Sequence, residues 1–233
     1  MPTIVLVRHG VTPATGKRLG GWTDASLSEK GVEQARAAAK RLAHLDVAAV
    51  YTSPIVRTRE TAALVAEPHG LEPVEHRGLA EVDYGEWTDR ELKELRKEPL
   101  WRTIQAAPSR VTFPGGGTIR GVAAAVTEAL EEIAAAHGDH DVVLAVSHAD
   151  VIKAALAQFL GLGLDSFQRI HVSPASCSVV HLAAGHPPMV LRTNDHGTIE
   201  VPEPPKDTDA SQDGSQEAPQ EAPQDGSEEG DAA

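Results

Sequence analysis

The sequence predicts a three-layer α/β/α protein, in which helices cover both faces of a largely parallel central sheet. Two observations predict this fold class. Short apolar, β-branched runs alternate along the chain with longer segments whose apolar residues recur every three to four positions, which is the pattern of strands separated by amphipathic helices. The 233 residues are 41% hydrophobic and 24% charged, a composition typical of an ordinary globular protein and enough chain for one α/β domain.

The chain is expected to open with a strand at residues 4–7 and a helix that begins after Ser28. Leu27 and Val32 occupy the two positions of a hydrophobic staple around Ser28. The residues expected on the buried face of this helix are Val32, Ala35, Ala39, Leu42 and Ala43. This strand and helix form the first of the alternating pairs.

A second strand is predicted at 48–52, followed by a helix for which Ser53 and Pro54 are the expected cap and first residue. A weak third strand is predicted at 72–76, and a polar helix at 89–97. This part of the chain therefore adds two strands with a helix between them.

The strongest apolar patterns lie in the second half of the chain. A long amphipathic helix is predicted at 118–136, with these residues facing inwards: Val122, Val126, Ala129 and Ile133. The strongest strand pattern, at 142–146, precedes an apolar helix at 149–160. Two closing strands at 177–182 and 189–192, joined by a turn, complete the predicted sheet.

The composition changes after residue 202. Residues 203–233 contain ten acidic residues and one basic residue, Lys206, and they lack aromatic residues, Leu, Ile, Val and Met. Such a segment cannot bury enough apolar area to offset the roughly 1–2 kcal/mol per residue that backbone ordering costs. We therefore expect a folded domain at 1–202 and a disordered acidic tail at 203–233.

Charge and composition also argue against several classes of function. The tail carries −9 of the net charge of −13, so the body has no basic excess for nucleic-acid binding. No apolar run is long enough to predict a membrane-spanning helix, and residues 1–8 lack the basic start of a signal peptide. The single cysteine, Cys177, can form neither an internal disulfide nor a zinc site by itself. We expect a cytoplasmic protein without membrane or nucleic-acid partners.

Polar side chains follow four predicted strands at their carboxyl ends. Arg8 and His9 end the first strand, Arg57 lies at the start of the helix after the second, Glu81 lies in the loop after the third, and His148 follows the fourth. Ligands of such sheets bind at the carboxyl ends of the strands, so we expect these side chains to converge. Each residue alone has an ordinary structural explanation, such as an ion pair on the helix surface for Arg57.

Together, these residue types suit phosphoryl transfer. Two guanidinium groups can bind a phosphate with bidentate, charge-assisted hydrogen bonds. An imidazole can attack phosphorus, and helix N-termini can donate N–H groups to the phosphoryl oxygens. A carboxylic acid can protonate the leaving oxygen.

Four motifs, in this order along the chain, resemble those of the histidine phosphatase superfamily, which is also called the phosphoglycerate-mutase-like family. They are Arg8-His9-Gly10 followed by Gly21-Trp22-Thr23-Asp24 and residues 27–35; an arginine motif at 51–62; an acid motif at 79–87; and Val146-Ser147-His148-Ala149. The resemblance covers about residues 3–195 and implies the phosphoglycerate-mutase-like fold.

The resemblance implies a role for each of the five converging residues. His9 would be the nucleophile that forms a phosphohistidine, and Arg8, Arg57 and His148 would hold the phosphoryl oxygens. Glu81 would act as the general acid for the leaving group and then as the base for water. The resemblance requires no metal and no cofactor, because the two arginines supply positive charge to the phosphoryl group.

The resemblance also implies contacts to the substrate. The backbone N–H of Ala149 would donate to the phosphoryl group, and Gly20 and Gly21 fall in the family's substrate loop. Thr15 stands where relatives often have asparagine, and we expect it to contact the phosphate. The domain at 1–202 would then be a histidine-phosphatase-like catalytic domain with a short lid at about 86–117.

Basic residues are interleaved with acidic ones in the predicted lid. Either they meet an anionic part of the substrate, or they form a solvated helix face. They are Arg90, Lys93, Arg96, Lys97 and Arg102.

Three functions fit these residues. The favoured one is a metal-independent phosphomonoesterase that acts on small phosphorylated metabolites through a phosphohistidine. The alternatives are a cofactor-dependent phosphoglycerate mutase or other phosphomutase, and a non-catalytic protein that binds a phosphorylated ligand on the same fold. The 66 residues between Glu81 and His148 favour hydrolysis, because the resemblance implies a longer insertion in mutases and a short lid admits water. The resemblance also suggests a homodimer.

Overall fold

The computed structural model describes residues 1–182 and 185–197 of the chain. The predicted tail at 203–233 lies outside these residues, as does part of the turn expected between the last two strands. Within the described residues, no helix is long and apolar enough to cross a lipid bilayer.

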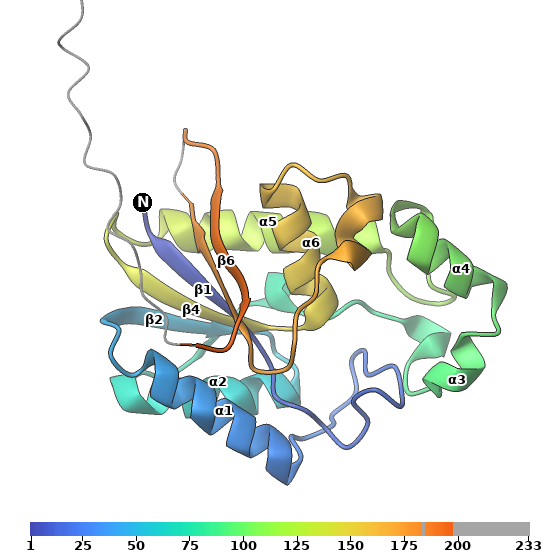
Figure 1. The fold of residues 1–233 in the computed structure, drawn as a ribbon, viewed down its shortest axis with the longest axis horizontal. Coiled ribbons are helices and arrows are strands. Elements are labelled where there is room, and N and C mark those ends of the chain that lie inside the picture. The colour runs from blue at the N-terminus through green and yellow to red at the C-terminus, as the bar shows by residue number, and fades with distance from the viewer. Residues whose placement is uncertain (183–184, 198–233) are drawn as a thin grey trace, which may run out of the picture. The chain divides into compact units, whose positions relative to one another are not determined.

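One six-stranded sheet organises the described part of the chain. Its strands are β1 (Thr3–Arg8), β2 (Val47–Thr52), β3 (Val74–Glu75), β4 (Val142–Ser147), β5 (Cys177–His181) and β6 (Met189–Asp195). They lie in the order β3-β2-β4-β1-β5-β6 (Figure 1). Strands β1 to β4 run parallel to one another, β5 pairs antiparallel with β1, and β6 pairs antiparallel with β5. The predicted largely parallel sheet is confirmed.

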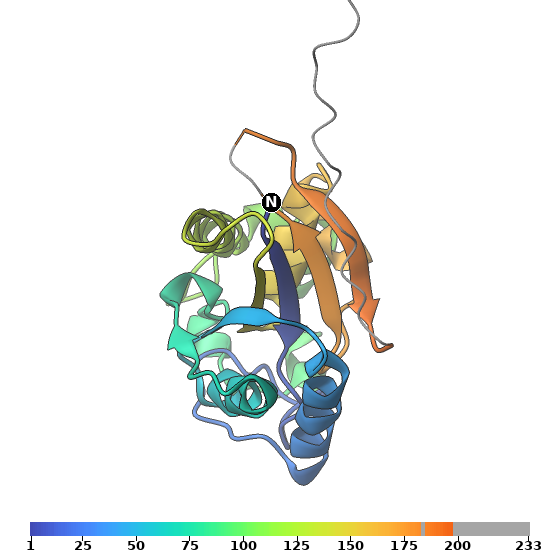
Figure 2. The ribbon, with the colours of Figure 1, turned by 90° about the vertical axis from the view of Figure 1, so that its left-hand side faces the viewer.

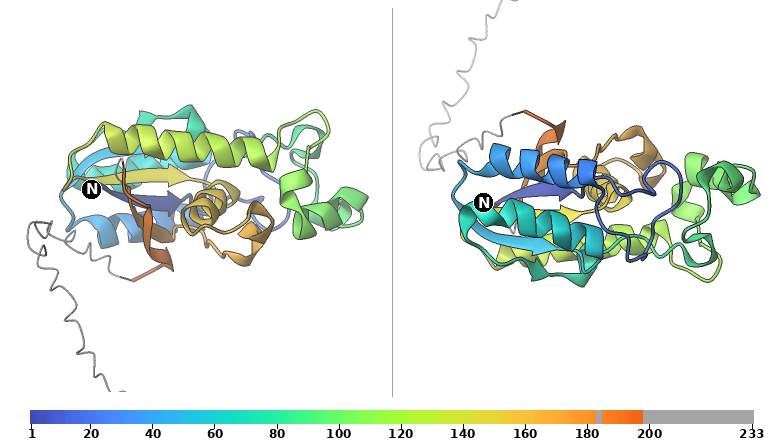
Figure 3. Two further views of the ribbon diagram at one scale, coloured as in Figure 1. Left: turned by 90° about the horizontal axis from the view of Figure 1, so that it is seen from above. Right: turned by 90° about the horizontal axis from the view of Figure 1, so that it is seen from below.

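Helices cover both faces of this sheet, as Figures 2 and 3 show for α1 and α2 on one side and α5 on the other. The α-helices are α1 (Glu29–Leu42), α2 (Val56–Ala66), α3 (Leu92–Leu95), α4 (Pro99–Ala106), α5 (Ile119–Ala135) and α6 (Ala149–Phe159). Short 3₁₀ helices are η1 (Glu67–His69), η2 (Arg77–Leu79), η3 (Gly85–Trp87), η4 (Pro108–Arg110) and η5 (Leu164–Arg169). The predicted three-layer α/β/α fold is confirmed.

The alternation of side chains along β1 joins the three layers. Val5 and Val7 belong to the core between the sheet and helices α1 and α2, whereas Ile4 and Leu6 belong to the core under α5 and α6. All four side chains are buried, because β1 lies between β4 and β5 in the middle of the sheet.

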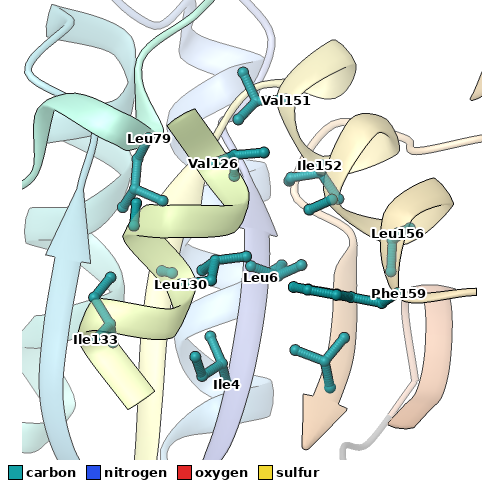
Figure 4. Close-up of a cluster of buried hydrophobic side chains, with 14 of the residues drawn as sticks. Ile4, Leu6, Leu79, Val126, Leu130, Ile133, Val151, Ile152, Leu156 and Phe159 are labelled. Atoms are coloured by element: carbon teal, nitrogen blue, oxygen red, sulfur yellow. The ribbon is translucent and has the colours of Figure 1, made fainter. Parts of the chain in front are cut away.

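The core under α5 and α6 is built from aliphatic side chains that interdigitate (Figure 4). Leu130 and Ile133 project from α5, and Ile152 and Leu156 project from α6 towards the sheet. Each of these side chains is buried. Burial of this kind contributes about 1.5–3 kcal/mol for each large aliphatic side chain, so this core fixes α6 against the sheet.

A third core lies beneath the segment that was predicted as a lid. Trp87 and Phe113 stack edge to face there, with ring centroids 5.8 Å apart. They pack with Leu95 from α3, Ile104 from α4 and Phe167 from η5. The segment is therefore anchored by its own apolar side chains.

Several local predictions are wrong in detail. The polar helix at 89–97 is only α3, because Asp89 adopts a left-handed conformation with φ +60°, and the sequence reasoning missed α4. The third strand is reduced to β3, whose two residues are exposed. On α1, Ala43 is exposed and lies past the end of the helix, and Val32 is half-buried.

The two predicted helix caps have different outcomes. Ser28 is the N-cap of α1 as predicted, and its hydroxyl accepts a hydrogen bond from Gly31 N–H at 3.2 Å. Helix α2 begins at Val56 after an N-cap at Ile55. Ser53 is thus not the N-cap, although its Oγ accepts a hydrogen bond from Ile55 N–H at 3.3 Å.

Candidate active site

The register of the parallel strands brings the predicted catalytic segments to one edge of the sheet. Arg8, the last residue of β1, pairs with Ser147, the last residue of β4. Just beyond the strands, His9 N–H donates to Ser147 O at 3.0 Å and Ser53 N–H donates to Val146 O at 3.1 Å. Three strands therefore end at the same level, and the residues that follow them are neighbours.

His9 is buried and held in one tautomer. Its Nδ1 lies 2.7 Å from Gly10 O, and because a carbonyl oxygen only accepts, Nδ1 carries the proton. Its Nε2 accepts a hydrogen bond from Arg57 Nε at 3.2 Å. Burial, and then the charges of Arg57 and Arg8, hold the pKa of His9 well below its usual value. The imidazole is therefore neutral, with its lone pair on Nε2.

Arg57 links the two histidines to the substrate loop. Its Nη2 donates to Gly21 O at 2.8 Å and lies 3.1 Å from His148 Nδ1. Gly21 has φ +51°, in the left-handed region where glycine is favoured. A Cβ there would also meet Thr88 Oγ1 at 3.0 Å. The loop that carries Gly21 is thus fixed on the arginine.

His148 is fully buried immediately before α6. Because a guanidinium only donates, Nδ1 of His148 accepts from Arg57, and Nε2 is the protonated nitrogen that donates to Ser53 Oγ at 2.8 Å. Burial and the charge of Arg57 lower the pKa of His148 well below its usual value. The imidazole rings of His9 and His148 lie with centroids 5.2 Å apart.

Glu81 has an unusual environment for a carboxyl group. Only 10% of its side chain is exposed, and Oε2 lies 3.9 Å from His148 Nδ1. Burial and then the charge of Asp150 raise the pKa of Glu81 to about 7, against the opposing effects of Arg57, Val82 N–H and Arg8. A proton is therefore available on this carboxyl near neutral pH.

Two hydrogen bonds position the loop that carries Glu81. Ser147 Oγ donates to Leu79 O at 2.7 Å, which ties the loop to the end of β4. The indole N–H of Trp22 donates to Glu81 O at 2.7 Å, and the Arg77 guanidinium lies 5.2 Å from the centroid of the Trp22 ring.

Arg8 supplies the second guanidinium. Its Nη1 donates to Val172 O at 2.7 Å, and its Nε is buried without a hydrogen-bond partner. Burial lowers the pKa of Arg8, whereas the nearby Glu81 acts in the opposite direction. An unpaired donor of this kind is rare in a folded protein and is suited to an anionic ligand.

These groups surround a pocket of about 170 Å³. Most of the predicted site residues line it: Arg8, His9, Thr15, Gly20, Arg57, Glu81 and Ala149. His148 and Gly21 do not line the pocket and contact Arg57 from behind. Thr15 Oγ1 is engaged as the acceptor for Thr12 N–H at 2.9 Å. Ala149 begins α6, where backbone N–H groups lack partners within the helix.

Several residues of this region were not predicted as site residues from the sequence. Arg18, Tyr84 and Asp150 line the pocket, and Ser53 holds His148. Asp150 follows His148 by two residues, which is the one local signal that could have indicated it. The basic residues of the predicted lid do not line the pocket. Three of them pair with carboxylates of their own segment.

Within residues 1–182 and 185–197, no group of three or more His, Cys, Asp or Glu side chains is placed to hold a metal ion. His137, one of two histidines close together in the sequence with His140, has its Nε2 3.1 Å from Tyr51 OH. The positive charge of the pocket comes from arginine side chains.

A neutral histidine beside two arginines and a carboxyl with a raised pKa, at the carboxyl ends of parallel strands, is an arrangement suited to phosphoryl transfer. The chain belongs to the histidine phosphatase superfamily, branch 1, whose family model matches residues 4–195.

Individual relatives include both phosphatases and mutases. The chain is 35% identical to phosphoserine phosphatase 1 of Hydrogenobacter thermophilus over 188 residues, which are 78% of this chain and 87% of that protein. It is 37% identical to the 2,3-bisphosphoglycerate-dependent phosphoglycerate mutase of Methylobacterium radiotolerans over 135 residues, 53% of this chain and 62% of that protein. The solved structure of Bacillus stearothermophilus YhfR is similar with a TM-score of 0.78 and 29% identity, over 84% of this chain and 98% of that one.

Proposed function

We propose that the protein is a metal-independent phosphomonoesterase that hydrolyses small phosphorylated metabolites through a phosphohistidine on His9. The observation that carries this proposal is the pairing of two protonation states in one pocket. His9 is neutral with its lone pair on Nε2, and Glu81 holds a proton near neutral pH. A nucleophile and a general acid are thus both in their active forms.

In the first step, His9 Nε2 attacks the phosphorus of the substrate, and the bond between phosphorus and the leaving oxygen breaks. Glu81 gives its proton to that oxygen, so the alcohol leaves neutral. Arg8 and Arg57 bind the phosphoryl oxygens with help from Ala149 N–H, and these donors stabilise the charge that spreads over the oxygens in the transition state. His148 acts through Arg57, which it contacts from behind the pocket.

In the second step, the Glu81 carboxylate takes a proton from a water molecule, whose oxygen attacks the phosphohistidine. The N–P bond breaks, inorganic phosphate leaves and His9 returns to its neutral form. The hydrogen bond from His9 Nδ1 to Gly10 O supports both steps, because it stabilises the positive charge that the ring gains when Nε2 is phosphorylated.

Hydrolysis is favoured over mutase activity by the position of the predicted lid. No residue of the predicted lid at 86–117 lines the pocket, so this short segment leaves the phosphohistidine accessible to water. A purely binding role is disfavoured because every group required for turnover is present.

The test supplies 3-phosphoglycerate with catalytic 2,3-bisphosphoglycerate and follows 2-phosphoglycerate and inorganic phosphate together, beside an aryl phosphate as a generic substrate. We expect phosphate release that persists in EDTA and is lost in His9→Ala, since loss of a nucleophile reduces kcat by orders of magnitude. Circular dichroism verifies the fold of the variant. Isomerisation that outpaces phosphate release would establish a mutase, and activity restored only by a divalent metal would reject the mechanism.

Cellular context follows from composition. We place the protein in the cytoplasm, without a nucleic-acid partner, because the body lacks a basic excess. Burial raises the pKa of the Cys177 thiol to about 11, so this cysteine is unreactive. The homodimer suggested by the resemblance stays a prediction that size-exclusion chromatography with light scattering can test.

A further inference from the structure

Two charged residues of the pocket have no assigned contact with the phosphoryl group in the proposed chemistry. Besides Arg8, His9, Arg57 and Glu81, the lining contains one cation, Arg18, and one anion, Asp150. The other lining residues are uncharged: Thr12, Ala14, Thr15, Gly16, Leu19, Gly20, Thr23, Ala25, Tyr84 and Ala149. Beyond the four residues of the proposed mechanism, the pocket lining thus presents one charge of each sign.

Asp150 is a fixed acceptor in the first turn of α6. Tyr84 OH donates to its Oδ2 at 3.0 Å, and Lys153 Nζ donates to its Oδ1 at 3.2 Å. Burial and the carboxylates of Asp150 and Glu81 raise the pKa of Tyr84, so the phenol keeps the proton that it donates. A carboxylate has about four acceptor positions, and two are used here, while 23% of the side chain is exposed.

Lys153, the cation next to Asp150, leaves the Asp150 carboxylate available to a ligand. Lys153 does not line the pocket, and its Nζ is also bound to Gln168 Oε1 at 3.2 Å. The carboxylate of Asp150 is therefore presented to the pocket with its geometry set from behind. Such an arrangement attracts a hydrogen-bond donor with positive charge and repels a second anion at the same place.

Arg18 is the complementary group and is less firmly held. Its Nη1 donates to Asp89 O at 2.6 Å and to Asp89 Oδ2 at 3.3 Å, and its Nη2 lies 3.8 Å from Glu91 Oε1. The side chain is 43% exposed, and exposed ion pairs of this kind contribute at most about 1 kcal/mol. The guanidinium can therefore exchange these partners for the carboxylate of a ligand.

We propose that Arg18 and Asp150 select phosphomonoesters whose leaving group is zwitterionic, such as the hydroxyl of an amino acid, with Asp150 binding the ammonium group and Arg18 binding the carboxylate. The proposal rests on the phosphatase function proposed above and names its substrate class. Both residues are specificity-determining, since the proposal places them on the leaving group and not on the phosphoryl group. Asp150 also raises the pKa of Glu81, and this general effect on turnover is the reason for comparing ratios between esters.

Four esters separate the two charges of the leaving group. O-phosphoserine carries both the ammonium and the carboxylate, 3-phosphoglycerate carries only the carboxylate, phosphoethanolamine only the ammonium, and glycerol 3-phosphate neither. We expect kcat/KM of the wild type to be highest for O-phosphoserine. Ratios between esters are compared within each variant, so that any general effect of a substitution on turnover cancels.

Asp150→Asn should lower the ratio of kcat/KM for O-phosphoserine over 3-phosphoglycerate by about tenfold or more, the usual size for loss of a hydrogen bond to a charged group. The ratio of 3-phosphoglycerate over glycerol 3-phosphate should stay within about twofold. Arg18→Gln should lower two ratios of kcat/KM, that of 3-phosphoglycerate over glycerol 3-phosphate and that of O-phosphoserine over phosphoethanolamine. Asparagine can still accept from Tyr84, and circular dichroism verifies the fold of both variants.

Asp139→Asn and Lys93→Gln are the matched controls, because both side chains are exposed and lie outside the pocket, and they should leave all ratios at the wild-type values. If the wild type hydrolyses aryl phosphate but the ratio of kcat/KM for O-phosphoserine over 3-phosphoglycerate is the same in the wild type and in Asp150→Asn, the proposed substrate class is overturned. The phosphatase function stands in that case. Failure of the wild type to release phosphate from any ester would reject both proposals.

Discussion

Replacement of Glu81 by glutamine should relieve a pH-dependent penalty on the folded protein. In the unfolded chain the pKa of this carboxyl has its ordinary value of 4.5, and burial together with Asp150 raises it to about 7 in the folded protein. Between these two values the folded state holds a proton that the unfolded state has released. The contribution of Glu81 to the free energy of unfolding therefore falls as the pH rises from 4.5 to about 7 and is constant above that range. The loss amounts to roughly 3 kcal/mol over the whole window.

Urea unfolding of the wild type and Glu81→Gln at pH 5.5 and pH 8 measures this penalty. Because the amide does not titrate, the stability of the variant relative to the wild type should increase by about 2 kcal/mol between these two pH values. Glu86→Gln, at an exposed carboxyl in the same segment, is the matched control and should follow the wild type. The kcat/KM of the wild type should fall above pH 7, as Glu81 loses its proton.

A difference between Glu81→Gln and the wild type that does not change with pH would refute this reasoning. It would mean that the carboxyl is already ionised in the free protein, and Glu81 could not then serve as the general acid.

Two further substitutions test the support of the site. Leu130→Ala, in the core under α5 and α6, should reduce the free energy of unfolding by about 2 to 5 kcal/mol, because this side chain is fully buried. Urea titration measures the change, and a loss below about 1 kcal/mol would contradict the packing. Ser53→Ala should reduce the free energy of unfolding by about 1 to 3 kcal/mol, because His148 Nε2–H loses its buried acceptor. The same substitution should lower kcat more than it raises KM. An unchanged kcat in Ser53→Ala would show that this hydrogen bond does not position His148.

The predicted part of the site follows from topology. Arg8, His9 and His148 are adjacent to strands with strong apolar patterns, and the carboxyl ends of parallel strands meet at one edge. Their convergence needs no knowledge of side-chain packing. The same rule placed Glu81 correctly, although β3 is only two residues long, because the loop after it is tethered to β4.

The errors arise where tertiary contacts override local preference. Ser53 resembles a helix cap in sequence, but its hydroxyl also serves His148, and α2 starts later. Asp150 resembles an ordinary acidic residue in the first turn of a helix, and only its contacts with Tyr84 and Lys153 reveal a pocket group. The helix expected at 89–97 is interrupted because residues 89–92 pair with the loop at 17–19.

The central position of β1 has a consequence for how activity arises during folding. This first strand ends next to His9, yet its partners are Val142–Ser147 and Cys177–His181. Pairing over such long sequence separations carries the entropy cost of closing large loops and is slow compared with local helix formation. A growing chain therefore cannot position His9 until the second half of the domain has been synthesised and the middle of the sheet has closed. Phosphatase activity is thus a property of the completed fold, and its recovery reports the last stage of assembly.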